Sequence, residues 1–482
     1  VAGAGYCSVP KTCDADEATC RSHSHSQRNP KPVISETAKS FAPEEPKNQK
    51  LVDHIIKQGG IVTDKMKIGY GKYGRGLFAA KDIKEGELLM EIPLSVCPTE
   101  QKTRDHPILG PMVKSMVEKG WATDFILALL IQYEKINLAS VGLESAGEFR
   151  TYVASLEAPN LPIFYRKKEA ESIQPYYVHK ELAKMTQRLM QSYNDIFVDG
   201  LFKSHPHIFS ATNTSPMSWG RSLALCWSRS YGLFKGQGSQ DVHWSLVPLS
   251  DLINHKIQRK NAYKQDFEQD PARFMVYANY DYKKGEELLN TYGEHTTLQY
   301  FFFYGMGIPN NPYDYIKLQF SFKNDTDKVM FSPAAEVNQT GIIPAWFLND
   351  LGKVLFKKYP NRYAMHIDDD PTDDQILLKN VHVGAQYITR FIEGKLIDLP
   401  TTLKDDLLRQ SDPVRQNEIL PEINQIHINY KKHLLKAIHY GRKITNDPIS
   451  IDEIMNSIET GPVSHVAHYG MALDLMEIDL AS

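Results

Sequence analysis

The chain has 482 residues, of which 42% are hydrophobic and 23% charged, with a formal net charge of -3 at pH 7. This length predicts two or three packed units rather than one core. The slightly acidic charge argues against nucleic acid as the main partner, because phosphate binding needs a concentrated positive surface. No apolar run approaches the roughly 20 residues that span a bilayer, so we expect a soluble protein with no membrane partner.

The first part of the chain differs in composition from the rest. Residues 1–48 are polar, and several prolines among them would break a helix, so we expect a disordered or loosely attached arm. Three of the five cysteines lie there: Cys7, Cys13 and Cys20. One disulfide with a free thiol would indicate an oxidising compartment. Because no C-x-x-C pair is present, a structural zinc site is disfavoured.

Short β-like runs follow the arm. They are separated by glycines and by the turn Lys84-Glu85-Gly86, and they cover residues 61–62, 65–70, 76–80 and 87–92. Runs of this kind between turn residues are typical of strands. We therefore predict the first part of a small antiparallel-sheet core over residues 49–106.

Residues 107–242 have mainly helical periodicity. Phe125, Leu129 and Tyr133 recur at four-residue spacing and so share one helix face. The predicted helices cover residues 121–137, 181–202 and 216–230. This segment is therefore predicted to be a helical insert.

Strand character returns in residues 243–312, which we assign to the second part of the core. The predicted strands cover residues 244–249, 273–282 and 287–292. The last two flank the turn Lys283-Lys284-Gly285-Glu286, and this arrangement predicts a β-hairpin.

Residues 313–482 change character again. One strand-like run at 315–322 precedes predicted helices at 342–359, 373–398, 402–410, 414–440 and 449–459. The acidic run from Asp368 to Asp374 lacks the Gly and the distal Glu of a calcium-binding EF-hand. Acidic residues before and within a first helical turn favour a helix start instead.

Three segments far apart in sequence contain candidate functional residues. The first, Tyr73-Gly74-Arg75-Gly76-Leu77-Phe78, places two glycines around an arginine, which lets the backbone approach a ligand closely. The second ends in Asp251-Leu252-Ile253-Asn254-His255, and the third is Leu288-Leu289-Asn290-Thr291-Tyr292-Gly293. Each is weak alone, since a lone Tyr is most often a half-buried core residue. Their occurrence together in this order is far more specific.

These segments resemble the SET-domain methyltransferases, in the branch that holds the Rubisco large-subunit lysine methyltransferase and the actin histidine methyltransferase. The resemblance covers residues 51–312 by motif and, beyond them, rests on length and helical character. It implies an α+β fold: a small antiparallel-sheet SET core split by a helical insert, then an all-helical C-terminal substrate-binding lobe.

The resemblance also implies S-adenosylmethionine as cofactor and assigns roles to residues at matching positions. Tyr292 would be catalytic, with its hydroxyl beside the sulfonium methyl group. Arg229 would pair with the cofactor carboxylate, a contact that suits a guanidinium. The remaining predicted cofactor-binding residues are Gly74, Arg75, Gly76, Asp251, Asn254 and His255. No metal is implied.

Two positions bear on the acceptor. Tyr231 follows Arg229 by two residues, and this position is aromatic in the lysine enzymes of the branch and a small amide in the histidine enzyme. Ser250, just before Asp251, is small, as in the lysine enzymes. Both favour a lysine side chain over the alternative, histidine. Tyr304 completes the predicted substrate-binding residues.

One position departs from the branch. After the catalytic tyrosine the branch carries an Asn where this chain has Thr297, which we expect to remove a polar contact near the cofactor pocket. A catalytically weak SET-fold binding or structural module is therefore a second hypothesis. A metal-dependent hydrolase using His205 and His207 ranks last, because no helical H-x-x-x-H pattern accompanies them.

The resemblance implies a protein substrate bound between the SET core and the C-terminal lobe, and a monomer. The need for S-adenosylmethionine favours an intracellular location. The cysteines of the arm and the absence of an initiator Met at Val1 leave a processed or secreted form open.

Overall fold

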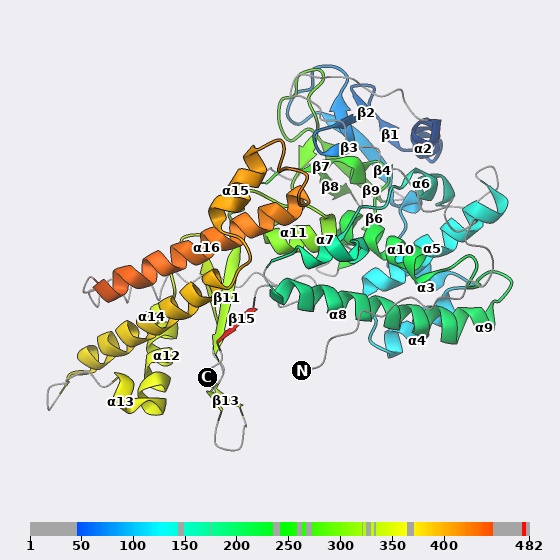
Figure 1. Ribbon diagram of the computed structural model, residues 1–482. Coiled ribbons are helices and arrows are strands. Elements are labelled where there is room, and N and C mark those ends of the chain that lie inside the picture. Colours follow the sequence, from blue (N-terminus) through cyan, green and yellow to red (C-terminus); the bar gives the residue numbers. More distant parts are fainter. Residues whose placement is uncertain are drawn as a thin grey trace.

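The structure is a computed structural model that describes residues 46–142, 149–174, 176–234, 242–257, 263–266, 272–320, 322–323, 329–331, 334–363, 371–446 and 475–478. The predicted arm, with its three cysteines, lies outside these residues except for its last three positions, and so does the helix predicted at 449–459. A sheet-rich core and the insert helices lie together on one side, and long C-terminal helices extend to the other (Figure 1).

The core contains the strands that the sequence predicts after the arm. Helix α2 (Pro46–Lys57) leads into them. The strands are β1 (Ile61–Val62), β2 (Met66–Gly71), β3 (Gly74–Ala79) and β4 (Leu88–Pro93). Strands β2 and β3 pair with each other, and β1 and β4 join β9 (Arg273–Tyr277) and β8 (Tyr263–Asp266) in an antiparallel sheet. The two predicted parts of the core therefore share one sheet.

The insert is helical, as predicted. Its long helices are α5 (Thr123–Val141), α8 (Tyr176–Tyr193) and α10 (Pro216–Arg229). Its shorter helices are α4 (Gly110–Glu118), α6 (Arg150–Ser155), α7 (Lys167–Glu171) and α9 (Phe202–Ser204), and α3 (Glu100–Asp105) precedes it at the end of the first part of the core. Ser215 caps α10 by accepting from the Ser218 backbone, and Pro216 suits the first helical position. The antiparallel pair β5 (Ser230–Phe234) and β6 (Val242–Leu246) follows α10.

The predicted hairpin across residues 283–286 is wrong. Strand β10 (Leu289–Asn290) pairs in parallel with β7 (Asn254–His255), whereas β9 pairs with β4 and β8. The chain turns where expected, but β9 and β10 do not pair across the turn. The side chain of buried Asn279 donates to the Leu289 carbonyl at 3.0 Å instead. Because of this change of partner, β10 lies beside Asn254 and His255.

The C-terminal region is mainly helical, as predicted, and forms a second hydrophobic core. Its helices are α12 (Ala345–Lys358), α13 (Pro360–Tyr363), α14 (Asp373–Ile397), α15 (Leu403–Ser411) and α16 (Pro421–Asn446). Thr372 caps α14 together with Gln375, so the acidic run does lead into a helix start. A Cβ on Gly352 would lie 2.0 Å from the Asn380 carbonyl, so glycine permits the close packing of α12 on α14.

This region is not entirely helical. It also contains a three-stranded sheet of β11 (Tyr315–Phe320), β14 (Ala334–Asn338) and β15 (Leu475–Ile478), and a pair of β12 (Phe322–Lys323) and β13 (Val329–Phe331). Among the described residues, no helix is both long and apolar enough to cross a membrane.

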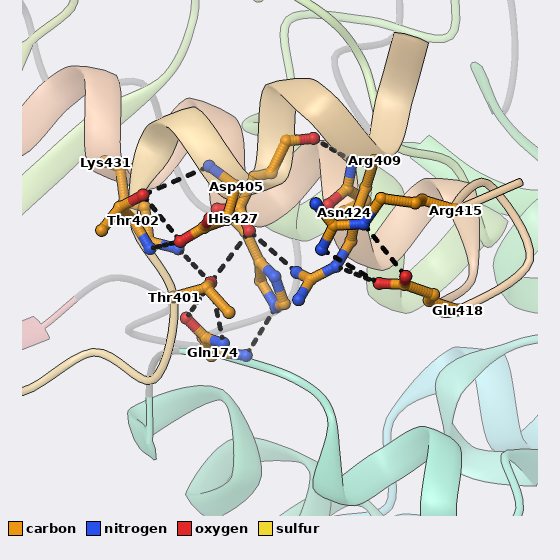
Figure 2. A network of polar contacts seen from close by, with 11 residues as sticks. Gln174, Thr401, Thr402, Asp405, Arg409, Arg415, Glu418, Asn424, His427 and Lys431 are labelled. Atoms are coloured by element: carbon orange, nitrogen blue, oxygen red, sulfur yellow. Dashed lines mark hydrogen bonds and ion pairs between the residues drawn. The ribbon is translucent and has the colours of Figure 1, made fainter. Parts of the chain in front are cut away.

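The insert and the C-terminal lobe are joined by polar contacts at α16. The Gln174 backbone donates to His427 Nε2 at 2.9 Å, as Figure 2 shows. The Tyr165 hydroxyl donates to Glu422 at 3.0 Å. Helix α11 (Thr297–Tyr304) packs against α10 of the insert and α16 of the lobe, and so links the lobe to the core.

Candidate functional site

The three candidate segments meet around residues 251–255. Asn254 Nδ2 donates to the Arg75 carbonyl at 3.1 Å. The Tyr292 backbone donates to His255 Nδ1 at 3.0 Å, and the Tyr292 hydroxyl donates to the Ile253 carbonyl at 3.1 Å. The parallel pairing of β7 with β10 sets these contacts, because it places Asn290 opposite His255. Residues distant in sequence thus form one hydrogen-bonded cluster.

The glycine loop fits closely against this cluster. Gly74 has φ +95°, a conformation that favours glycine. A Cβ on Gly76 would lie 2.7 Å from both Asn254 Nδ2 and Glu287 Oε1. Asn254 Nδ2 also donates to Glu287 at 2.7 Å, so this carboxylate holds the amide in place. Glu287 was not among the predicted site residues, although it directly follows the Lys283–Glu286 turn.

Arg229 and Asp251 form a buried pair beside the cluster. Arg229 Nη1 donates to the Asp251 carbonyl at 2.9 Å and approaches its Oδ2 at 3.3 Å. The Tyr152 hydroxyl donates to the same Oδ2 at 2.8 Å. Burial raises the pKa of Asp251, while Arg229 and Tyr152 favour its charged form. Tyr152 lies in the insert, in a helical pattern that gave no sign of this role.

The Arg75 side chain leaves the glycine loop and contacts the insert. Its Nη1 donates to the Ser155 carbonyl at 2.7 Å and lies 3.6 Å from Glu157 Oε1, and its Nη2 donates to Asn48. The guanidinium therefore ties α2 and the end of α6 to the loop. None of these three partners could be selected from sequence, because each is a single polar residue in an unrelated segment.

Histidine and tyrosine rings surround Tyr292. The pKa of His255 is lowered to about 4, mainly by burial, so this ring is neutral at pH 7. Because Nδ1 accepts from the Tyr292 backbone, the hydrogen of the neutral ring lies on Nε2. The rings of Tyr292 and Tyr304 are 5.0 Å apart, and those of His255 and Tyr300 are 4.7 Å apart. Burial also raises the pKa of Tyr292, which keeps its phenol protonated.

Tyr231 contributes a second aromatic wall. Its ring packs edge-to-face on Tyr263 at 5.5 Å and on Phe274 at 5.2 Å. Its hydroxyl lies 3.1 Å from the Ser250 carbonyl, to which it donates. Leu249, just before Ser250, has φ +67°, a strained conformation for a residue with a side chain, and such strain is concentrated at functional sites.

The residues present fit S-adenosylmethionine. His255 Nε2 is buried and has no hydrogen-bond partner among the described residues, and Arg229 Nη2 has only a long contact of 3.3 Å to the Glu157 carbonyl. Such unpaired buried donors are costly unless a bound group accepts from them. A carboxylate and a purine supply acceptors of this kind. In the part of the chain that the structure describes, no group of three or more His, Cys, Asp or Glu residues is placed to hold a metal ion.

Thr297, the residue that departs from the branch, contacts a different part of the molecule. Its Oγ1 donates to Asp314 at 2.7 Å and accepts from Asn429 Nδ2 at 3.0 Å. This buried cluster joins α11 to α16. Thr at this position therefore affects how the lobe is attached to the core. Its side chain forms no hydrogen bond to residues 251–255.

Comparison with known proteins agrees with this geometry. The family described as SET domain matches residues 74–293. N-lysine methyltransferase setd6 of Xenopus laevis is 24% identical over 243 residues, which are 49% of this chain and 51% of that protein. Actin-histidine N-methyltransferase of Danio rerio is 22% identical over 310 residues, 63% of this chain and 47% of that protein. The chain thus matches about half the length of these relatives.

Solved structures give the same fold. The SET domain of LSMT bound to MeLysine and AdoHcy has a TM-score of 0.64 at 15% identity, covering 84% of this chain and 93% of that one. Rubisco LSMT bound to AdoMet has a TM-score of 0.61 at 14% identity, covering 83% and 93%. Residues 74–293 therefore match the SET domain, and the chain has the same fold as these LSMT structures.

Proposed function

We propose that this chain is a protein methyltransferase that uses S-adenosylmethionine to methylate a lysine side chain. The observation that carries the proposal is the convergence of the Gly74–Gly76 loop, Asn254-His255 and the Tyr292 hydroxyl in one hydrogen-bonded cluster. The SET domain, the relatives named as lysine methyltransferases and the LSMT fold support it.

Each predicted cofactor residue has a task in this proposal. Arg229 would hold the carboxylate through Nη2, since Nη1 is engaged by Asp251 and Nε is enclosed. Asn254 and His255 would contact the adenosine and amino-acid parts, and the Gly74–Gly76 loop would provide close backbone contact. When bound, S-adenosylmethionine supplies an electrophilic methyl group on a good leaving group.

Tyr292 positions the reacting groups rather than exchanging a proton. Its phenol stays protonated, and the hydrogen bond to the Ile253 carbonyl fixes the direction of its oxygen. The Tyr292 and Tyr304 rings lie 5.0 Å apart and would line an apolar wall for a lysine amine, which is more easily deprotonated in such surroundings. Alignment of an amine with a bound electrophile accounts for much of the rate gain in such reactions.

The second aromatic wall favours lysine as the acceptor. The Tyr231 hydroxyl donates to the Ser250 carbonyl and so does not offer its hydrogen to an imidazole. The aliphatic stem of lysine needs only apolar contact. Histidine is the alternative, since actin-histidine methyltransferases are among the relatives.

We further propose that a protein substrate lies between the core and the C-terminal lobe. Helix α11 carries Tyr304, whose ring lies 5.0 Å from that of Tyr292, and the same helix packs against α16 of the lobe. The site and the lobe are therefore neighbours along α11, which supports this placement. We retain a monomer and an intracellular location, where S-adenosylmethionine is made, as parts of the proposal.

Methylation of a cell extract with labelled S-adenosylmethionine tests the proposal. The purified chain should label protein on lysine, and Tyr292→Phe should reduce this by about 100-fold or more, with cofactor affinity retained, because only the orienting hydroxyl is lost. Equal labelling by the variant would remove Tyr292 from the mechanism. Label on histidine would identify the other acceptor.

A further inference from the structure

The insert helix α6 contacts the charged residues of the site directly. Tyr152, in the middle of α6, is 2% exposed, and its hydroxyl donates to Asp251 Oδ2 at 2.8 Å. Arg229 Nη1 approaches the same oxygen at 3.3 Å and donates to the Asp251 carbonyl at 2.9 Å. One carboxylate oxygen is thus shared by a phenol and a guanidinium.

From these contacts we propose that Tyr152 is a positioning residue that sets the direction of Arg229 through Asp251, and thereby tunes the affinity of the site for the carboxylate of S-adenosylmethionine. The proposal rests on the proposed function. It gives helix α6 a role in cofactor recognition in addition to its packing against α2 and α5.

The Tyr152 hydroxyl is suited to this task because it is a permanent donor. Burial and the neighbouring Asp251 carboxylate raise the pKa of Tyr152 well above its usual value, so the phenol keeps its hydrogen. The Asp251 side chain is 2% exposed, so no solvent donor readily replaces it. Without the phenol, Oδ2 would keep only its contact with Arg229 and would draw the guanidinium closer, or the carboxyl would take up a proton.

A change at Nη1 changes what the rest of the guanidinium can bind. Arg229 Nη2 has a long contact of 3.3 Å to the Glu157 carbonyl, and Nε has no partner among the described residues. Nε is enclosed, so Nη2 is the part of the guanidinium that a ligand carboxylate can share. A hydrogen bond from Nη2 requires the plane of the guanidinium to face the carboxylate, and the direction of this plane follows from where Nη1 is held.

A comparison of two ligands separates positioning from packing. Titration calorimetry would measure S-adenosylmethionine and decarboxylated S-adenosylmethionine, which keeps the sulfonium and the amine, against the wild type and Tyr152→Phe. We expect the variant to lose about 10-fold in affinity for S-adenosylmethionine and less than about 2-fold for the decarboxylated compound. The ratio of the two affinities is independent of any fraction of unfolded protein.

Tyr193→Phe is the matched control. Tyr193 is also a buried tyrosine of the insert, but its hydroxyl donates to the Thr214 carbonyl at 2.9 Å and does not contact Arg229 or Asp251. This variant should leave the affinity ratio unchanged. In an Arg229→Lys background, Tyr152→Phe should have little further effect on the ratio, because the planar guanidinium is already lost.

An equal loss for both ligands in Tyr152→Phe, or no loss, would show that Tyr152 only packs and would overturn the inference alone. Failure of the wild type to bind either ligand would instead overturn the proposed function, and the inference with it. The two failures are therefore distinguishable in one set of titrations.

Discussion

The candidate site and the junction between the insert and the C-terminal lobe both contain mostly buried Arg, Asp and His side chains. The two regions differ in how completely these side chains are hydrogen-bonded. At the junction, Lys431 and Arg409 both bind the fully buried Asp406 carboxylate (Figure 2 shows Lys431 and Arg409). Arg409 Nε also binds Glu418 at 2.9 Å. The charged donors of the junction are therefore satisfied by neighbouring carboxylates.

Each region also contains a buried neutral histidine that accepts from a backbone N–H. His427 accepts from Gln174 at the junction, and His255 accepts from Tyr292 at the site. Both leave the second ring nitrogen without a partner among the described residues. A buried histidine therefore does not distinguish a site from a structural contact in this chain.

The guanidinium groups differ more. Arg409 Nε binds Glu418, whereas Arg229 Nε has no hydrogen-bond partner among the described residues and Nη2 has only a long contact of 3.3 Å. Arg273 Nε, outside the site, also has no hydrogen-bond partner among them. We propose that the junction stabilises the fold and that Arg229 is left with a donor for a ligand. Mutations should therefore separate into effects on unfolding at the junction and effects on cofactor affinity at the site.

The largest effect is expected from Asp406→Ala. Removing the shared carboxylate leaves Lys431 and Arg409 with buried positive charge, which should lower the free energy of unfolding by about 3–5 kcal/mol. Denaturant unfolding measures this. Glu418→Ala, at a side chain that is 44% exposed, should cost less than about 1 kcal/mol. Similar small losses in both variants would contradict the structural role of the junction.

The second effect is on the pH dependence of stability. Burial lowers the pKa of His427 to about 3, so between pH 6.5 and about 3 the unfolded chain binds a proton there that the folded chain does not. This term is fully favourable above pH 6.5 and is lost as the pH falls, by up to about 1.4 kcal/mol per pH unit. His427→Gln should reduce the slope of unfolding free energy against pH from 6.5 to 4.5. Identical slopes would refute a neutral buried ring.

The third effect is on affinity and comes from Arg229→Lys. Lysine keeps a positive charge beside Asp251, so stability should change little, but the planar guanidinium for a carboxylate is lost. Binding of S-adenosylmethionine, measured by calorimetry, should weaken about 10-fold. The assignment of Arg229 fails if the affinity is unchanged.

The smallest effect is expected from Gly76→Ala. The added Cβ would lie 2.7 Å from Asn254 Nδ2 and must displace this amide, which should weaken cofactor binding about 5-fold. Gly394→Ala is the control, because a Cβ there meets no heavy atom within 4 Å. If both variants bind equally well, the loop does not form part of the site.

The sequence predicted much of this arrangement because its signals are local. The short strands after the arm and the long helices were confirmed, although the strand predicted at 273–282 ends at Tyr277 and the helix predicted at 414–440 begins at Pro421. The hairpin at 283–286 was predicted wrongly, because a turn signal does not reveal that Asn279 donates to Leu289 and that β10 pairs with β7. Pairing across such distances depends on tertiary contacts that local patterns do not encode.

The candidate site shows the same division. The motif residues near Asn254 and Tyr292 were named from their order in the chain, and the structure brings them together. Tyr152 and Glu157 were missed because they lie in a part of the insert that resembles no motif, whereas Arg229 and Tyr231, later in the insert, were recognised. A polar residue that supports another residue is recognised only when the contact is seen.

Titration of the wild-type chain with S-adenosylmethionine tests most directly whether residues 74–76, 251–255 and Tyr292 form one cofactor site. We predict one molecule bound per chain with a dissociation constant of about 1 µM to 1 mM, and much weaker binding by Asn254→Ala. Absence of binding by the folded wild-type chain at about 1 mM, or equal binding by Asn254→Ala, would contradict it.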